Sequence, residues 1–550
     1  MADIAARIDQ LFAEWDRPDS PGCALGVIQE GQLVYARGYG MADLEREVPI
    51  TPASVFDIGS TGKQFTAMII AILADQGRLS LDDPIQQHLP EMPDYEQPIT
   101  LRHLLHHTSG LRDYTDLMGL ADMPTENTYP EEQLFDLIAR QQGLNFRPGQ
   151  AYLYSNSGYF LLGVIVRRVT GTSLLELIQE HILQPLGMRH TSFNDDYGQV
   201  VKGRALSYAP REGGGYRNEL SLCGGFGDGP ILSSVEDLFL WDQNFYRNRL
   251  GGGGPELLRH MLTPARLNNG QPLGYALGLW LDRYRGRATV SHGGGWAGYR
   301  SELVRFPEQS FSVVCLANLS SMAPTRLARQ VADIYLAPHL EGAGPAPHLP
   351  PGTPTEGAGL ADALTGEETR PPQSFVLTRQ EMERRAGFYR SVETGHLWEL
   401  SIREGKLTAR AFDDSFELES TGPTRLRAVD APVEVEVEFR EPLSMRVERE
   451  DSPPEWYRKL ETIPPASLAD YVGDYTSAEL KVTYSITHAE GGLWLRRGYA
   501  PRQALKPASG DIFIARGLHE WGSLELEFAR DERGTLDVSA EGARHLRFTR

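Results

Sequence analysis

A stretch that cannot build a core of its own divides the chain. Residues 342–374 are dominated by Pro, Gly, Ala and Thr, as in Gly344-Pro345-Ala346-Pro347. Such a segment cannot bury enough apolar surface to order itself, so its composition indicates a linker. A chain of 550 residues also exceeds what one hydrophobic core normally serves. We therefore expect two to four domains, with a first domain over residues 1–340 and a linker over 341–374.

The part after the linker has the pattern of a β-structure that occurs twice. Val435, Val437 and Phe439 alternate with glutamates, which is the period of a strand with one wet face. An internal repeat has a constant offset of 86 residues: Gly387, Tyr389, Ser391, Leu400, Gly405 and Leu407 match Gly473, Tyr475, Ser477, Ile486, Gly491 and Leu493. Each copy has about the length of an up-and-down antiparallel barrel, whose closure removes exposed strand edges. We predict two such barrels, over residues 375–455 and 463–550.

The part before the linker has strands at both ends and helices between them. An amphipathic helix over 3–16 and a hairpin that turns at Glu30-Gly31 come first. A helical and loop region over about 80–200 follows, and then strands over 275–317 and a helix over 323–335. This order permits the terminal strands to pair in one sheet against a helical half.

Ser60-Thr61-Gly62-Lys63 places a hydroxyl and an amine three residues apart at the start of a buried helix. Residues i and i+3 share a helix face, so Lys63 is expected beside Ser60. A lysine kept neutral by burial can take the proton of a serine nucleophile, and the unpaired N–H groups of a helix start can stabilise an oxyanion. The motif alone is weak evidence, because serine often caps helices and lysine often lies on their solvated faces. The helix is predicted from the apolar spacing of Phe65, Met68, Ile69, Ile70, Ile72 and Leu73, with Gly77 at its end.

Two later sequence elements, which follow the Ser-x-x-Lys motif in order, make a catalytic interpretation of that motif stronger. Tyr154-Ser155-Asn156 precedes an apolar run, and His292-Gly293-Gly294 lies between strand-like pieces. With these three elements the chain resembles the serine β-lactamase and penicillin-binding protein family, in its branch of D-aminopeptidases and class C-like esterases. Other segments extend the resemblance over the first 340 residues: Leu104 to Tyr114, Pro185-Leu186-Gly187-Met188, Gly224-Gly225 and Ser233 to Leu238.

The resemblance implies a fold class. It is an α/β (α+β) β-lactamase-like catalytic domain followed by two all-β domains, each an antiparallel, lipocalin-like barrel. D-Aminopeptidases of this family likewise carry two C-terminal barrels, so the likeness extends loosely to the tail.

The resemblance also implies roles for the site residues. Ser60 attacks an amide or ester carbonyl, and Lys63 and Tyr154 move its proton to the leaving group, with the identity of the base left open. Asn156 is expected to bind Lys63 and the substrate's amide oxygen. The N–H groups of Ser60 and Gly295 form the oxyanion hole, beside Gly294 in a strand that the substrate approaches closely. Taken alone, Tyr154 also fits a core aromatic and Asn156 a turn residue.

Two positions bear on specificity. Family members usually have a lysine followed by Thr or Ser where this chain has His292 and Gly293, and those groups hold a substrate carboxylate. Histidine is only partly charged near neutrality and glycine offers no hydroxyl, so a carboxylate end should be held less well. Glu520, in the loop Arg516 to Gly522, could meet a substrate ammonium, although an ordinary barrel turn is the alternative.

These features favour a D-stereospecific aminopeptidase or amidase that works through an acyl-serine. One alternative is a carboxylesterase with weak β-lactamase or D-Ala-D-Ala carboxypeptidase activity. Another is a β-lactam or muropeptide-binding protein that does not turn over. The expected partner is a small peptide, amide or ester, and a homodimer is left open.

Composition excludes several other classes. A net charge of −20 with no long basic stretch argues against nucleic acid and anionic membranes as partners. The best apolar run, Met68 to Ala74, is far too short to cross a bilayer, and the first residues lack a signal peptide pattern, so we expect a cytoplasmic protein. Cys23, Cys223 and Cys315 lack metal-ligand spacing and are expected to be reduced. The pair His106-His107 has no completing ligands, so neither a metal nor a cofactor is predicted.

Overall fold

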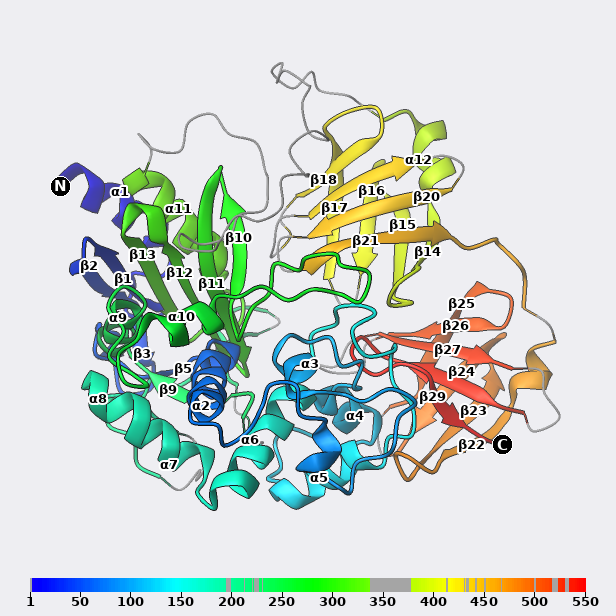
Figure 1. Cartoon of the computed structure of the whole chain (residues 1–550). Coiled ribbons are helices and arrows are strands. Elements are labelled where there is room, and N and C mark those ends of the chain that lie inside the picture. The colour runs from blue at the N-terminus through cyan, green and yellow to red at the C-terminus, as the bar shows by residue number, and fades with distance from the viewer. Residues whose placement is uncertain are drawn as a thin grey trace. The chain divides into compact units, whose positions relative to one another are not determined.

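The N-terminal part of the chain is built on one antiparallel sheet of six strands, in the order β10-β11-β12-β13-β1-β2 (Figure 1). Strands from the two ends of this region pair directly, with Leu25 opposite Cys315. The predicted first hairpin is present, and it turns through Glu30 and Gly31 with positive φ angles of 49° and 76°, as tight hairpins require. The strands are β1 (Cys23–Gln29), β2 (Gln32–Tyr39), β10 (Trp280–Tyr284), β11 (Arg287–Trp296), β12 (Tyr299–Phe306) and β13 (Phe311–Ala317).

The computed structural model describes residues 2–193, 199–211, 213–219, 221, 227–229, 231–336, 377–411, 414–429, 431, 435–440, 443–449, 452–465, 467–498, 501–516, 523–529 and 534–550. The predicted linker over 341–374 lies outside these residues. So do Glu520, Cys223 and Gly224-Gly225.

Helices cover both faces of the sheet, because alternate strand residues point to opposite sides. On one face α1 (Ala2–Phe12) and α11 (Pro324–Leu336) bury Phe12 and Val331 against strand residues such as Leu25 and Val313. On the other face α9 (Val235–Asn244) packs on β1 so closely that a Cβ at Gly26 would lie 2.4 Å from Val235 Cγ1.

One helix of the N-terminal region, α2 (Lys63–Asp75), is buried and packs against α6, α7 and α10. Helix α2 begins at Lys63 rather than at the predicted Ser60, because Gly59–Gly62 form the tighter 3-10 turn η1. Every residue from Lys63 to Leu73 is buried. The helices are α2 (Lys63–Asp75), α3 (Leu101–Leu105), α4 (Tyr114–Leu120), α5 (Glu131–Ala139), α6 (Asn156–Thr170), α7 (Leu174–Ile178), α8 (Gln184–Leu186) and α10 (Pro255–Met261). Short strands complete the region: β3 (Met41–Asp43), β4 (Val48–Pro49), β5 (Phe56–Asp57), β6 (Ser192–Phe193), β7 (Tyr208–Pro210), β8 (Tyr216–Asn218) and β9 (Ile231–Ser233). Among the described residues, no helix is long and apolar enough to span a bilayer.

The C-terminal part forms two eight-stranded antiparallel structures, as predicted. After α12 (Arg379–Arg385), the first is a closed barrel of β14 (Gly387–Ser391), β15 (Leu397–Arg403), β16 (Lys406–Ala411), β17 (Asp414–Ser420), β18 (Arg425–Val429), β19 (Val435–Arg440), β20 (Ser444–Arg449) and β21 (Ser452–Lys459). The second contains β22 (Gly473–Ser477), β23 (Val482–Ala489), β24 (Gly492–Arg497), β25 (Gln503–Ser509), β26 (Ile512–Ala515), β27 (Leu524–Phe528), β28 (Leu536–Ser539) and β29 (Leu546–Phe548). Two backbone hydrogen bonds between Thr476 and Thr549 nearly close it into a barrel.

The internal repeat is visible in the details of the two barrels. Strands β14 and β22, and likewise β16 and β24, start and end at positions 86 residues apart. In both barrels a buried tyrosine donates a hydrogen bond to the carbonyl four residues upstream, from Tyr389 to Arg385 at 2.8 Å and from Tyr475 to Tyr471 at 3.0 Å. The sequence repeat is therefore a repeat of structure.

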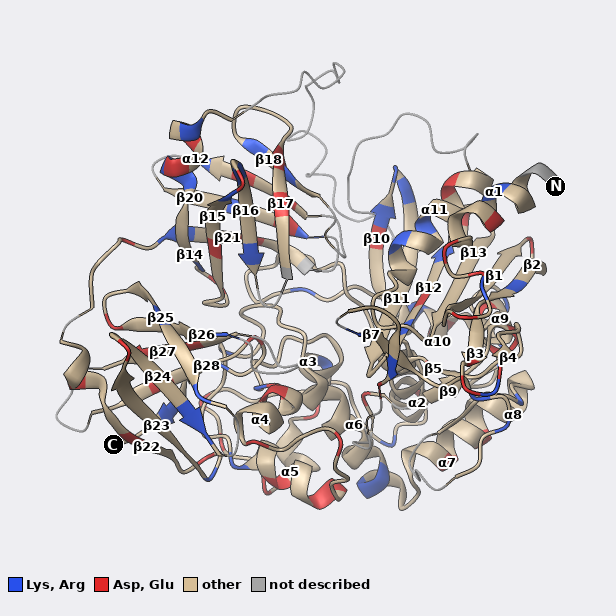
Figure 2. Cartoon of the chain, turned by 180° about the vertical axis from the view of Figure 1, so that it is seen from behind, with Lys and Arg blue, Asp and Glu red and all other residues tan. Residues whose placement is uncertain are grey.

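Acidic and basic residues are interspersed along the strands of both barrels (Figure 2). Some oppose each other on neighbouring strands, as Lys406 and Glu417 do at 2.6 Å. Exposed pairs of this kind contribute little to stability because solvent screens them, so these charges act mainly on solubility.

Two compact units divide the chain differently from its order in sequence. One comprises Met1–Ser109, Thr125–Phe135 and Asn156–Thr353, and the other comprises Gly110–Pro124, Asp136–Ser155 and Pro354–Arg550. Two segments of the N-terminal region are thus grouped with the barrels. The domain boundaries proposed from the sequence stay predictions.

Candidate active site

The nucleophile candidate Ser60 lies in a sharp turn at the start of the buried helix α2. Gly59 precedes it with a φ of 49°, a conformation that suits glycine. The N–H of Gly59 donates to Asp57 Oδ1 at 2.8 Å, which ties the turn to the end of β5. Ser60 is partly exposed, whereas Lys63 is fully buried. The turn therefore presents a reachable hydroxyl above a desolvated amine.

Lys63 connects the turn to two other parts of the same compact unit. Its Nζ lies 3.0 Å from Ser60 Oγ and donates to Asn156 Oδ1 and to the main-chain oxygen of Asp228, both at 2.8 Å. The amide and main-chain oxygens can only accept, so they take two N–H groups. The third direction of the amine faces the serine hydroxyl, which can donate to a neutral amine or accept from an ammonium. The structure thus brings Ser60, Lys63 and Asn156 together.

Strand β11 lies directly against the nucleophile turn because its glycines carry no side chain. A Cβ at Gly294 would lie 2.9 Å from Ser60 N and 2.0 Å from Ile58 O. A Cβ at Gly59 would lie 2.8 Å from Gly295 N. Gly295 itself is exposed. The backbone N–H groups of Ser60 and Gly295 therefore belong to two segments of the chain in close contact, as an oxyanion hole requires.

His292 differs from the sequence expectation in its charge. Burial lowers its pKa to about 3, with Lys63 adding to the shift and the Gly293 carbonyl opposing it. Its ring bonds Tyr275 Oη at 2.9 Å through Nε2 and the Gly293 carbonyl at 2.6 Å through Nδ1. The expectation of partial charge near neutrality is wrong, because the sequence could not show that this position is buried. His292 is a neutral polar group.

Gly293 lies opposite Glu302 on the neighbouring strand β12. A Cβ there would lie 2.9 Å from Glu302 Oε2, on the neighbouring strand. Glu302 is buried and accepts a hydrogen bond from Thr325 Oγ1 at 2.7 Å. Desolvation raises the pKa of Glu302, while Thr325 and Arg329 lower it.

Several residues around the site carried no sequence signal. Asp57 is buried beneath the nucleophile turn, and burial raises its pKa to about 6 against the lowering effects of Gly59 N–H and Arg204. Gly278, with a φ of 69°, makes room for the Lys63 backbone. Asp228 accepts from Lys63 through its main-chain oxygen, a contact that the side chain type could not reveal.

Tyr154 lies in the segment Asp136–Ser155, which belongs to the other compact unit than Ser60. It comes two residues before Asn156, whose amide contacts Lys63. Its share in proton transfer stays a prediction, and so does the role of Glu520, which lies outside the described residues. Among the residues that the structure describes, no group of three or more His, Cys, Asp or Glu could hold a metal ion. His106 is buried, and desolvation lowers its pKa to about 3. Cys23 and Cys315 are free and buried.

A serine hydroxyl beside a buried lysine, with the strand β11 against the serine turn, defines the class of active-serine enzymes that use a Ser-x-x-Lys pair. The family model described as Beta-lactamase matches residues 7–336. The chain therefore belongs to the Beta-lactamase family. A second model, described as a domain of unknown function (DUF3471), matches residues 457–544, which span most of the second barrel.

The chain is similar to several curated proteins. It is 30% identical over 338 residues to a D-aminopeptidase of Gluconobacter oxydans, which covers 62% of this chain and 63% of that protein. It is 32% identical over 306 residues to penicillin-binding protein 4* of Bacillus subtilis, covering 52% of this chain and 66% of the relative. A D-aminopeptidase of Brucella anthropi is 25% identical over 549 residues, or 96% of this chain and 95% of its own length. The match thus spans somewhat less than two thirds of the first two relatives.

Solved structures share the fold. The octameric penicillin-binding protein homologue from Pyrococcus abyssi has a TM-score of 0.56 at 24% identity, covering 83% of this chain and 99% of its own. The D-amino acid amidase from Ochrobactrum anthropi SV3 has a TM-score of 0.52 at 23% identity, and the match covers 61% of this chain and 98% of the amidase. At these identities the comparison supports the predicted fold class.

Proposed function

We propose that the chain is a serine hydrolase that works through an acyl-serine, and most specifically a D-stereospecific aminopeptidase or amidase. The observation that carries the proposal is the contact of Lys63 Nζ with Ser60 Oγ, within a partly buried set that includes Asn156 and the Asp228 carbonyl. The substrate class is supported by two relatives named D-aminopeptidase, one of which matches nearly the whole chain.

In the proposed reaction, Ser60 Oγ bonds to the substrate's carbonyl carbon and gives its proton to Lys63, with Tyr154 as the second proton carrier. The N–H groups of Ser60 and Gly295 hold the oxyanion. When the C–N bond breaks, the proton passes to the leaving amine. Water then attacks the acyl-serine, releasing the acid product and restoring the hydroxyl. Asn156 keeps Lys63 oriented and offers its amide N–H to the substrate.

The surroundings of His292 favour a substrate without a carboxylate at the site. A neutral imidazole and a glycine provide no permanent positive charge and no hydroxyl there. We propose Glu520 as a partner for the free ammonium of the substrate. These features together favour a peptide or amide read from its amino end.

The test is a matched set of chromogenic substrates. D-Alanyl p-nitroanilide should be cleaved faster than its L-enantiomer, and its N-acetylated form should lose most of the activity. Ser60→Ala serves as the blank for each substrate. Hydrolysis of p-nitrophenyl acetate with refusal of every D-aminoacyl amide would replace the aminopeptidase by the carboxylesterase alternative. A penicillin adduct retained for hours, without turnover of any substrate, would instead favour the binding protein.

A further inference from the structure

The second barrel binds segments of the N-terminal region that lie in its own compact unit. The turn between β28 and β29 provides the main contacts. Its Gly542 accepts from Asp113 N at 2.7 Å and donates to the Asp116 carboxylate. A Cβ at Gly542 would lie 2.7 Å from Asp113 Cβ, so the backbone of the turn lies close to the segment that contains Asp113. This turn is therefore shaped to dock on the segment Gly110–Pro124.

Arg112 is the centre of this contact. Its Nε donates to Arg544 O at 2.7 Å and its Nη2 donates to His545 O at 2.6 Å. Its Nη1 reaches Glu479 Oε2 at 2.6 Å and Gln141 Oε1 at 3.0 Å. The residue is only 3% exposed. A planar guanidinium can make these divergent contacts at once, which a lysine ammonium cannot.

The second docked segment is the irregular stretch Arg140–Ser155, which contains no helix or strand although every residue of it is described. Asn145 uses both ends of its amide there: Oδ1 accepts from Arg544 N at 2.8 Å and Nδ2 donates to Gly542 O at 2.9 Å. Glu479 adds contacts with Arg140 Nε at 3.1 Å and Gln142 N at 3.2 Å. An irregular segment has no hydrogen-bond ladder of its own to set its path, so these contacts supply it.

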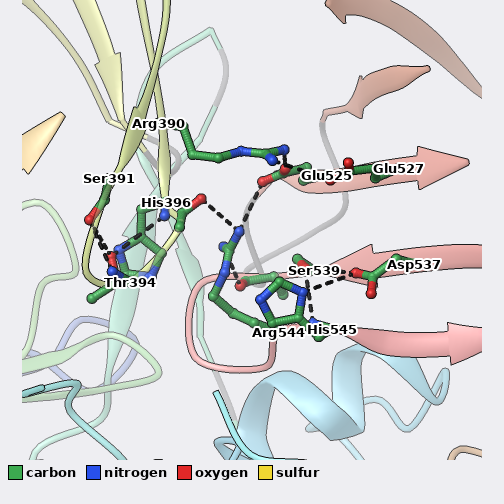
Figure 3. Close-up of polar contacts among 12 residues, drawn as sticks. Arg390, Ser391, Thr394, His396, Glu525, Glu527, Asp537, Ser539, Arg544 and His545 are labelled. Atoms are coloured by element: carbon green, nitrogen blue, oxygen red, sulfur yellow. Dashed lines mark hydrogen bonds and ion pairs between the residues drawn. The ribbon is translucent and has the colours of Figure 1, made fainter. Parts of the chain in front are cut away.

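The turn between β28 and β29 also forms hydrogen bonds with the first barrel. Arg544 Nη2 donates to Gly395 O at 2.7 Å and lies 3.0 Å from Glu525 Oε2, and Glu525 also pairs with Arg390 (Figure 3). His396 Nε2 contacts Glu541 O at 2.7 Å. Arg544 and Glu525 are both buried, so the network joins the turn to the first barrel in a medium where charge pairs are poorly screened.

We propose that the second barrel is a positioning module for the catalytic tyrosine, and that Arg112 and Asn145 are its positioning residues. The barrel fixes the start of Arg140–Ser155 through Arg112, Asn145 and Glu479, and so sets the path of the backbone that leads to Tyr154 within the same compact unit. The inference depends on the proposed function, in which Tyr154 transfers a proton. It assigns a role to the region that matches a domain of unknown function.

The test uses the full chain with Arg112→Lys and Asn145→Ala, and Arg102→Lys as the matched control. Arg102 also pairs through its guanidinium, but with Asp82 on the surface, where its side chain is 44% exposed. Both test variants should lower kcat by tenfold or more, toward the roughly 10²-fold loss that a displaced catalytic group can cause. KM should change little, and the basic limb of the pH profile of kcat/KM should shift. Hydrogen exchange of residues 143–155 should become faster.

The outcomes separate the two proposals. A folded Asn145→Ala or Arg112→Lys variant with wild-type kcat and pH profile would overturn the positioning role. If Arg112→Lys fails to fold, Asn145→Ala carries the test, because it removes the two hydrogen bonds of Asn145 with the turn between β28 and β29 without removing a charge. A wild-type chain that hydrolyses p-nitrophenyl acetate but no D-alanyl amide rejects the aminopeptidase alone, and the variants are then compared on the ester. A wild-type chain inert toward both substrates rejects both proposals.

Discussion

Gly294→Ala tests whether the close approach of strand β11 to the nucleophile turn is needed for catalysis. The new methyl group would lie 2.0 Å from Ile58 O, 2.6 Å from Ser301 Oγ and 2.9 Å from Ser60 N. Two of these three atoms belong to the backbone and cannot rotate away. The strand must therefore move off the turn, and Gly295 N must move with it.

Gly294→Ala should have two effects, a loss of stability and a loss of activity. Overpacking a well-filled site typically costs about 1–3 kcal/mol of stability, and a contact with backbone at this distance should lie at the upper end of that range. Displacing one oxyanion donor typically lowers kcat by about 10²–10³-fold. Because the donor acts on the transition state, KM should change much less than kcat.

The assay compares kcat and KM on D-alanyl p-nitroanilide with the urea midpoint of the same preparation. Gly254→Ala is the control, since a Cβ there meets nothing within 4 Å and its φ is not left-handed. A Gly294→Ala enzyme with wild-type kcat would refute the reasoning, whatever its stability. Loss of activity in full proportion to the unfolded fraction would show that the glycine serves the fold only.

Three further predictions concern the same site. Ser60→Ala should keep its thermal midpoint and lose all turnover, and Lys63→Ala should be nearly as inactive because the two act as one unit; intact-mass spectrometry after β-lactam exposure should detect no adduct on either. Asp57 has a pKa of about 6 in the folded chain against about 3.9 unfolded, so its own contribution to stability should fall by about 3 kcal/mol as pH rises from about 4 to about 6 and then level off. Buried histidines such as His106 and His292 act in the opposite direction, so the test is the comparison with Asp57→Asn. The change in unfolding free energy between pH 4 and pH 7 should differ between the two proteins by that amount, and an equal change in both would contradict the assignment. Because the pKa of His292 is about 3, any D-Ala-D-Ala carboxypeptidase activity should not rise as pH falls from 8 to 5; a rise that His292→Asn abolishes would show that the imidazole gains a proton there.

Much of the fold could be predicted because it depends on local patterns. The alternation in β19, the hairpin at Glu30-Gly31 and the repeat at offset 86 are each written in short stretches of sequence. The pairing of Ser60 with Lys63 was also predictable, since residues three apart lie on one face in both α and 3-10 geometry. The start of the helix was not, because it depends on how Gly59 and Gly62 pack against β11 and Ile231.

Other features of the site could not be read from the sequence because they depend on residues far apart in it. The neutral state of His292 is set by its burial and by the nearby Lys63, and Gly293 lies opposite the buried Glu302 on another strand. The carbonyl group that accepts from Lys63 at Asp228 is present in every residue type, so the sequence does not mark it. These features need three-dimensional placement, which periodicity does not give.

The grouping of chain segments is the clearest case of information that sequence order hides. Arg112 belongs to a segment recognised as part of the catalytic region, yet its guanidinium binds main-chain oxygens more than 430 positions later. Every residue type has a main-chain carbonyl, so no sequence pattern marks these contacts. The composition break near residue 340 predicts a first domain over residues 1–340, and segments on either side of α5 within that range form hydrogen bonds with the last barrel. Removing the barrels would leave a buried arginine and the Asn145 amide without those partners, and loss of such hydrogen bonds typically costs about 1–3 kcal/mol for each buried group. The second barrel therefore supplies hydrogen bonds that hold the segments Gly110–Pro124 and Asp136–Ser155 within their compact unit.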